Sequence, residues 1–303
     1  MGSSRWDPSD WKSYASVTST KTVDKIFTKN ELAEELDPKG AKTRESRDSV
    51  LNPNSSAIIV GLDVTGSMGI LADNLAKKGL GVLFEEILSR KPVPDPHIMV
   101  MGIGDAHYDR APFQVSQFEA DITITKWLEK LYLEHGGGGN HFESYNLPWY
   151  FAATHTAIDC FEKRGKKGFL FTVGDEEPPP SLLADHVAHV IGDTPQYDLN
   201  THDLLAMVKR MYNVFHVIVE EGDYASNHPS ETIGAWVDLL GQRAIRLSDH
   251  TKLAEVIVSV LEVEGGKSKD AVIGSWDGST QVVVGHAIDA LEKSARGSGV
   301  VRV

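Results

Sequence analysis

Three oxygen-bearing side chains, Asp63, Thr65 and Ser67, occupy alternate positions directly after an apolar run. The run, residues 57–62, is partly β-branched and predicts a buried strand. This strand would deliver one carboxylate and two hydroxyls to the C-terminal edge of a sheet, where open α/β sheets bind ligands. Hard oxygen atoms of this kind suit Mg²⁺, Mn²⁺ or Ca²⁺ and not soft metals.

The elements that must position these side chains follow from the rest of the chain, in which strand-like and helix-like patterns alternate. We expect strands at 97–103, 168–173, 214–219 and 244–247, a short edge strand at 113–118, and helices at 70–90, 122–134, 148–164, 181–190, 203–211, 230–240 and 251–262. Alternation of this kind predicts an α/β fold with a doubly wound, mainly parallel sheet and helices on both faces.

Two further polar clusters, 105–110 and 175–177, each follow a predicted strand. A glycine segment at 136–139 and the polar residues at 140–144 precede a predicted helix in the same manner. Because the carboxyl ends of parallel strands share one edge of the sheet, we expect these loops to gather around the oxygen cluster.

The flanking regions predict three parts. Residues 1–54 are a polar N-terminal arm, 55–264 are the α/β domain, and 265–303 are a C-terminal tail. Trp6 and Trp11 leave two interpretations of the arm open, since it could pack on its own domain or dock a neighbouring subunit.

Composition limits the classes of partner. The net charge of -13 argues against extensive contact with a nucleic-acid backbone, which needs a basic face. No segment approaches the roughly 20 apolar residues of a membrane span, and the N-terminus lacks the apolar core of a signal peptide. The single cysteine, Cys160, excludes an internal disulfide and fits a reducing compartment, so we predict a cytoplasmic location without membrane contact.

The stretch from Asp63 to Gly69, which reads Asp-Val-Thr-Gly-Ser-Met-Gly, resembles the metal-ion-dependent adhesion site of the von Willebrand factor type A (VWA) family. That motif is Asp-x-Ser-x-Ser, with Thr tolerated at the first hydroxyl position. The resemblance extends over residues 55–263 in strand and helix order. It implies a doubly wound sheet with one antiparallel edge strand, which residues 113–118 could supply.

The resemblance also implies a threonine ligand from a second loop and an aspartate ligand from a third. Asp175 matches the third loop. In the second loop this sequence has glycine where the threonine would align, so that ligand is absent or replaced. The candidates, in order of preference, are Ser144, Glu143 and Asn140.

The expected function is binding and not catalysis. A site with neutral hydroxyls and few direct carboxylates leaves the cation electrophilic, so that an Asp or Glu of a partner protein can complete its coordination. We therefore predict a non-enzymatic, metal-dependent adaptor or scaffold module. The resemblance suggests AAA+ ATPases or the components of an assembly as partners.

Three alternatives stay open. The chain could be a structural subunit of a larger, possibly phage-encoded assembly with a vestigial metal site. It could be a Mg²⁺-dependent phosphotransferase or phosphatase of the haloacid-dehalogenase type with Asp63 as nucleophile, although the second acid of that family is replaced by Thr65. Thr65 and Ser67 could also simply cap the following helix.

Overall fold

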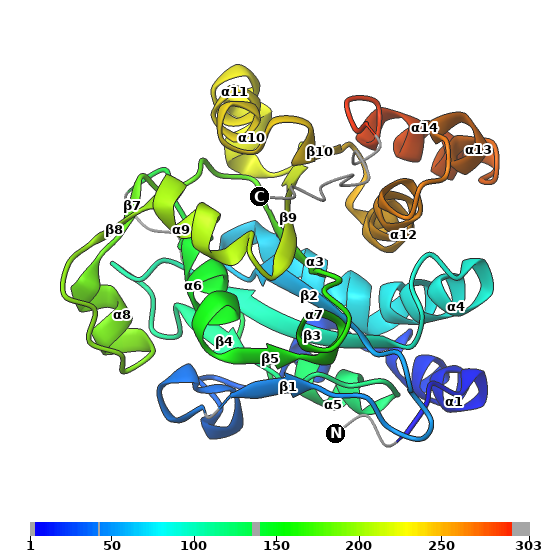
Figure 1. The fold of residues 1–303 in the computed structure, drawn as a ribbon, viewed down its shortest axis with the longest axis horizontal. Helices are drawn as coiled ribbons and strands as arrows, with labels where there is room; N and C mark the ends of the chain where they lie inside the picture. Colours follow the sequence, from blue (N-terminus) through cyan, green and yellow to red (C-terminus); the bar gives the residue numbers. More distant parts are fainter. Residues whose placement is uncertain (1–3, 42, 135–139, 293–303) are drawn as a thin grey trace, which may run out of the picture.

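The computed structural model describes residues 4–41, 43–134 and 140–292, and a six-stranded sheet forms its centre (Figure 1). The strands, in spatial order, are β10 (Ala244–Leu247), β9 (Tyr212–Val219), β6 (Gly168–Gly174), β2 (Ser56–Asp63), β3 (Pro96–Ile103) and β4 (Phe113–Val115). The first five are parallel, and β4 pairs antiparallel with β3 at the edge. The predicted fold class, including its antiparallel edge strand, is confirmed.

The sheet is buried on both faces, as a continuously apolar strand such as β2 requires. Alternate residues of β2 enter different cores: Ile58 and Val60 belong to one cluster, and Ala57 and Ile59 to the other. The first cluster includes residues of α3 (Gly69–Asn74), η4 (Leu75–Gly79), α4 (Leu80–Arg90), α5 (Thr123–Leu128) and α12 (Leu253–Glu264). The second includes residues of α6 (Asn146–Thr154), α7 (Asp159–Glu162), α8 (Ala184–Val190), α9 (Thr201–Val208), α10 (Asp223–Asn227) and α11 (Pro229–Leu240).

The N-terminal arm packs on its own domain. It contains α1 (Pro8–Thr18), α2 (Val23–Ile26), η1 (Glu34–Leu36), η2 (Pro38–Gly40) and β1 (Arg44–Ser46). Trp6 and Trp11 are buried in the first core, and the Trp6 ring stacks on Phe84 of α4 at a centroid distance of 4.2 Å. A Cβ added at Gly81 would lie 2.0 Å from Nε1 of Trp11, so the arm rests directly on the backbone of α4.

The region after α12 joins the same core. Its helices are α13 (Lys269–Ile273) and α14 (Gly278–Ala287), and both contact α12. Val284, Ile288 and Leu291 are fully buried there, while the Arg90 guanidinium lies 3.7 Å from the centre of the Trp276 ring. The described part of the tail therefore lies on the central domain.

Three predicted helices are shorter than their apolar patterns suggested, and in two of them a short strand that pairs with a distant segment is the cause. The helix predicted at 148–164 is divided by β5 (Thr156–Ile158), which pairs with β1 of the arm. The helix predicted at 181–190 begins at Ala184, because β7 (Ser181–Leu182) pairs with β8 (Leu199–Asn200). The helix predicted at 122–134 ends at Leu128.

The helix predicted at 70–90 is interrupted by a π-turn, η4, between α3 and α4. Short 3₁₀ turns complete the fold: η3 (Gly66–Met68), η5 (Gly241–Arg243) and η6 (His250–Lys252). Within the described ranges, no helix combines the length and apolar character that crossing a membrane requires.

Candidate metal centre

The ends of β2 and β6 bring Asp63 and Asp175 to the same edge of the sheet. Leu62 pairs with Val173 in the parallel register, so Asp63 and Asp175 follow paired residues on adjacent strands. Burial raises the pKa of Asp63, and the nearby charge of Asp175 raises it further. The two loops therefore form one local site.

Asp63 and Thr65 form a closed hydrogen-bonded turn. Oδ1 of the fully buried Asp63 accepts from the backbone N–H of Thr65 at 2.9 Å and from its hydroxyl at 2.6 Å. Gly66 follows with φ +39°, a backbone conformation that favours glycine. Because the hydroxyl hydrogen of Thr65 is committed to Asp63, the oxygen lone pairs remain for an electrophile.

Tyr145, which the sequence analysis did not single out, holds the other oxygen of Asp63. Its hydroxyl donates to Oδ2 of Asp63 at 2.8 Å across 82 residues of sequence. The same hydroxyl accepts from the backbone N–H of Glu176 at 3.4 Å. An aromatic residue just before α6 carries no local signal for this role, so only the tertiary contact identifies it.

Asp175 is fixed by the segment that leads into α10. Its Oδ2 accepts from the backbone N–H of Tyr224 at 2.8 Å. Gly222 makes this approach possible, because a Cβ at this position would lie 2.3 Å from Cβ of Asp175. Burial is the main cause that raises the pKa of the Asp175 carboxyl.

A cavity of about 320 Å³ opens beside these residues, and we call it the metal cavity. Its lining consists of Thr65, Gly66, Met68, Glu143, Asp175, Glu176, Asp223, Tyr224, Asn227 and His228. Glu143 is only 3% exposed, and neither its Oε2 nor Oε2 of Glu176 has a hydrogen-bond partner among the described residues. Buried carboxylate oxygens without partners are costly, and a cation in this cavity would compensate them.

The electrostatics of the metal cavity also favour binding of a cation. Burial, followed by the charges of Asp63 and Asp175, raises the pKa of Glu176 to about 8. Burial and the charge of Asp63 also raise the pKa of Glu143 far above its ordinary value. These carboxyl groups repel one another when ionised, and a divalent cation reverses that penalty. The residues present therefore fit a hard divalent cation.

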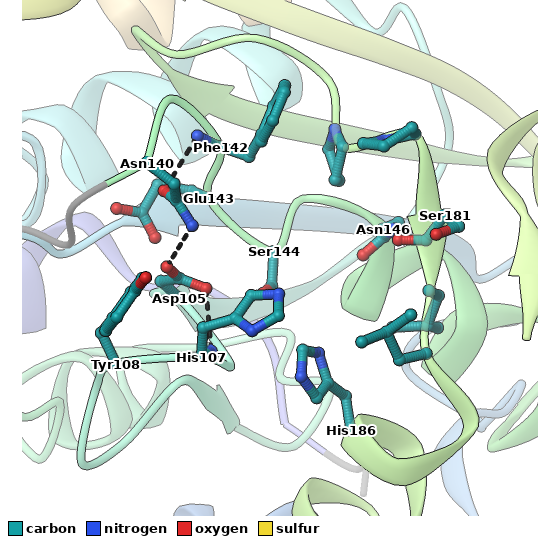
Figure 2. A pocket seen from close by; sticks show the side chains of 14 residues that line it. Asp105, His107, Tyr108, Asn140, Phe142, Glu143, Ser144, Asn146, Ser181 and His186 are labelled. Atoms are coloured by element: carbon teal, nitrogen blue, oxygen red, sulfur yellow. Dashed lines mark hydrogen bonds between the residues drawn. The ribbon is translucent and has the colours of Figure 1, made fainter.

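The three candidates for the second-loop ligand lie in different surroundings. Glu143 lines the metal cavity. Oγ of Ser144 accepts from the backbone N–H of Ala106 at 3.0 Å, and Asn140 donates to Oδ2 of Asp105 at 2.7 Å. Both of these residues line a neighbouring cavity (Figure 2). The geometry favours Glu143 over Ser144, which the sequence ranked first, and the assignment stays a prediction.

Parts of the predicted site are not described. The side chain of Ser67, the second hydroxyl of the motif, lies outside the described residues, although its backbone belongs to η3. Residues 135–139, which include the glycine segment, also lie outside them. Asp105 and Asp109, which border the site, shape their own loop, since Oδ2 of Asp109 accepts from the backbone N–H of Asp105.

A second group of possible ligands lies elsewhere. One atom each of Glu221, Asp249 and His250 comes within 4.8 Å of the others. The exposed Glu221 already accepts from the backbone N–H of His250 and lies 2.9 Å from its Nδ1, while Asp249 accepts from Thr251. These carboxylates are satisfied by their own neighbours, in contrast to Glu143 and Glu176.

Substitution of Gly222 tests whether its backbone packs closely against the side chain of Asp175. We expect Gly222→Ala to lower the free energy of unfolding by about 1–3 kcal/mol, because the new methyl overlaps Asp175. Gly234→Ala is the matched control: Gly234 lies inside α11 with nothing within 4 Å of the added methyl, so alanine should stabilise the protein by about 0.5–1 kcal/mol. Urea unfolding measures both, and an unaltered stability of Gly222→Ala would contradict the close approach.

Comparisons with known proteins find solved structures that are similar to this chain at low sequence identity. No protein-family model matches the chain, and no curated protein matches it. The open conformation of the pilus adhesin SpaC from Lactobacillus rhamnosus GG is similar over 77% of this chain and 31% of the adhesin, with 9% identity and a TM-score of 0.44. A von Willebrand factor type A protein from Catenulispora acidiphila is similar over 71% of this chain and 44% of its own, with 15% identity and a TM-score of 0.40.

The ArnB paralog VWA2 from Sulfolobus acidocaldarius is similar over 67% of this chain and 44% of its own, with 12% identity and a TM-score of 0.29. This chain thus spans less than half the length of each of the three structures. Two of them carry the von Willebrand factor type A name that the motif at Asp63 suggested. At these TM-scores the similarity carries no conclusion about activity or partners.

Proposed function

We propose that the chain is a metal-dependent protein-binding module. Asp63, Thr65, Ser67 and Asp175, with Glu143 from the second loop, would hold a divalent cation, Mg²⁺ in the first place. When bound, the cation supplies an electrophile for an Asp or Glu side chain of a partner protein. The observation that carries this proposal is the pair of unpartnered carboxylate oxygens, on Glu143 and Glu176, around a cavity that Thr65 also lines.

The donor set supports a hard cation. Hydroxyl and carboxylate oxygens are the ligands that Mg²⁺ and Ca²⁺ prefer, and soft metals select thiolates instead. Asp63 serves as a support and not as an exposed ligand, because both of its oxygens accept hydrogen bonds, from Thr65 and from Tyr145. Supports of this kind orient the direct ligands and tune the affinity for the metal.

The same enclosure disfavours the phosphotransferase alternative. A nucleophilic carboxylate must reach the phosphorus atom of a substrate, whereas Asp63 is 0% exposed and hydrogen-bonded at both oxygens. The hydroxyl of Thr65 also donates to Asp63, so it is not available as a general acid in this arrangement. We therefore retain the proposal of a non-enzymatic module.

We propose that the module acts as an adaptor, beside an AAA+ ATPase or within an assembly. We also propose a cytoplasmic location. The buried thiol of Cys160, whose pKa burial raises, supports a location in which no disulfide is needed.

Calorimetry with Mg²⁺, combined with capture of partners in Mg²⁺ or in excess EDTA, tests the proposal. Thr65→Ala should weaken Mg²⁺ binding by about 10- to 100-fold and abolish metal-dependent capture. Thr251→Ala is the matched control, because Thr251 makes the same two hydrogen bonds to Oδ1 of Asp249, at 2.9 and 2.6 Å, outside the metal cavity. Capture that is equal in EDTA would refute the proposal, and normal capture by Thr65→Ala would favour the structural-subunit alternative.

A further inference from the structure

A second cavity of about 320 Å³, whose lining Figure 2 shows, shares Glu143 with the metal cavity. We propose that this cavity, here called the basic-side-chain pocket, binds an arginine or lysine side chain of the same partner protein. This proposal rests on the proposed protein-binding function. The partner segment would thus present an acidic side chain to the metal and a basic side chain to this pocket.

The charge of the pocket supports a cationic occupant. Two buried carboxylates line it, Asp105 at 2% exposure and Glu143 at 3%, and none of the described lining residues is lysine or arginine. Oδ1 of Asp105 accepts from the backbone N–H of His107 at 2.9 Å, and its Oδ2 accepts from the Asn140 amide at 2.7 Å. Each oxygen keeps a free lone pair, and the neutral donors leave the charge uncompensated.

Glu143, which lines both cavities, supplies a further indication of a ligand on this side. It is more than nine-tenths buried, lines the pocket, and its Oε2 has no hydrogen-bond partner in the described parts of the chain. Retaining an unpaired buried carboxylate oxygen is costly unless a ligand satisfies it. A guanidinium group, with five N–H donors in a planar fork, matches two carboxylates better than a neutral group does.

The remaining walls suit the stem of a long basic side chain. Pro179, Pro180, Leu182 and Leu183 supply apolar surface along which methylene groups can lie while the charged head reaches the carboxylates. Tyr108 lines the pocket while remaining 63% exposed, so its ring is free to contact a cation.

Two histidines of the pocket face each other. The rings of His107 and His186 lie edge to face at a centroid distance of 4.3 Å (Figure 2). Burial and the neighbouring His107 lower the pKa of His186, which favours the neutral form of its ring.

A pair of small probes tests the pocket without knowledge of the partner. We expect N-acetyl-arginine methylamide to bind the full chain about tenfold or more tightly than the uncharged citrulline analogue of the same shape, as charge-assisted hydrogen bonds require. Titration followed by NMR, in saturating Mg²⁺ and again in EDTA, measures both affinities. Equal affinities of the two probes would overturn the proposal. Binding of the arginine probe only in EDTA would also overturn it, because that result places the probe in the metal cavity.

Two variants locate the probe. Leu183→Arg should abolish arginine binding by placing its own guanidinium in the pocket, whereas the neutral Leu183→Gln should retain it. Asp105→Asn should weaken binding about tenfold, and Asp10→Asn, which makes the same charge change on the exposed surface of α1, should not. Unchanged arginine binding in both Leu183→Arg and Asp105→Asn would refute the pocket.

The two proposals fail separately. Loss of metal dependence in the capture experiment, with arginine binding intact, would remove the metal-bridging function and leave the pocket. Mg²⁺-dependent capture with equal binding of both probes would remove the basic-side-chain pocket and leave the metal-bridging function.

Discussion

Asp63→Asn is expected to lower the affinity of the chain for Mg²⁺ by about 100-fold while leaving the metal-free protein at least as stable as the parent. The amide has the shape of the carboxylate, so its oxygen can still accept from the N–H and hydroxyl of Thr65, while its NH2 group can donate to the Tyr145 hydroxyl, which donates to the carboxylate in the parent. Burial raises the pKa of Asp63, which means that the ionised carboxylate is unfavourable there without a cation. The neutral amide removes this penalty together with the charge that the metal needs.

Calorimetry with Mg²⁺ and urea unfolding in EDTA at pH 7.5 measure the two effects independently. Glu255→Gln is the matched control, because Glu255 is a buried carboxylate on α12 that lines neither cavity and pairs with Lys252. An unaltered affinity for Mg²⁺ in Asp63→Asn would mean that the cation binds elsewhere. A large loss of stability without metal would mean that the charge of Asp63 has a structural role.

The stability of the metal-free protein is expected to fall as the pH rises from 5 to 8. The pKa of Glu176 is about 8 in the folded state, above its ordinary value of 4.5, so the folded protein binds this proton more tightly than the unfolded chain. Stability from this group is therefore fully present below the ordinary pKa and is lost as the pH approaches 8. Burial shifts the pKa values of Asp63 and Asp175 in the same direction.

We expect the loss to reach about 2–4 kcal/mol over this interval, since one unit of pKa shift corresponds to roughly 1.4 kcal/mol. Mg²⁺ favours the ionised carboxylates, so its stabilising effect should increase with pH. Thermal unfolding at several pH values, in EDTA and in Mg²⁺, measures the difference, with NaCl at equal ionic strength as control. A metal-free stability that rises with pH would contradict the assignment of the buried carboxylates.

The sequence by itself determined the elements whose signals are local. The apolar run before Asp63 predicts β2, and the turn from Asp63 to Thr65 depends on residues two positions apart, so its geometry follows from nearby residues. The alternation of strands and helices predicts the parallel sheet, and the short segment beginning at Phe113 supplies its antiparallel edge. In a parallel sheet, strand ends share an edge, and this brings Asp175 to Asp63.

Only the tertiary structure decided which other residues complete the site. The contact from Tyr145 to Asp63 joins residues 82 positions apart, and no local pattern encodes a contact between such distant residues. The close approach of Gly222 to Asp175 and the pairing of β1 with β5, which divides a predicted helix, have the same origin. The burial of Glu143 between two cavities likewise depends on loops that meet only after the sheet has formed, because desolvation is a property of the packed protein and not of the local sequence.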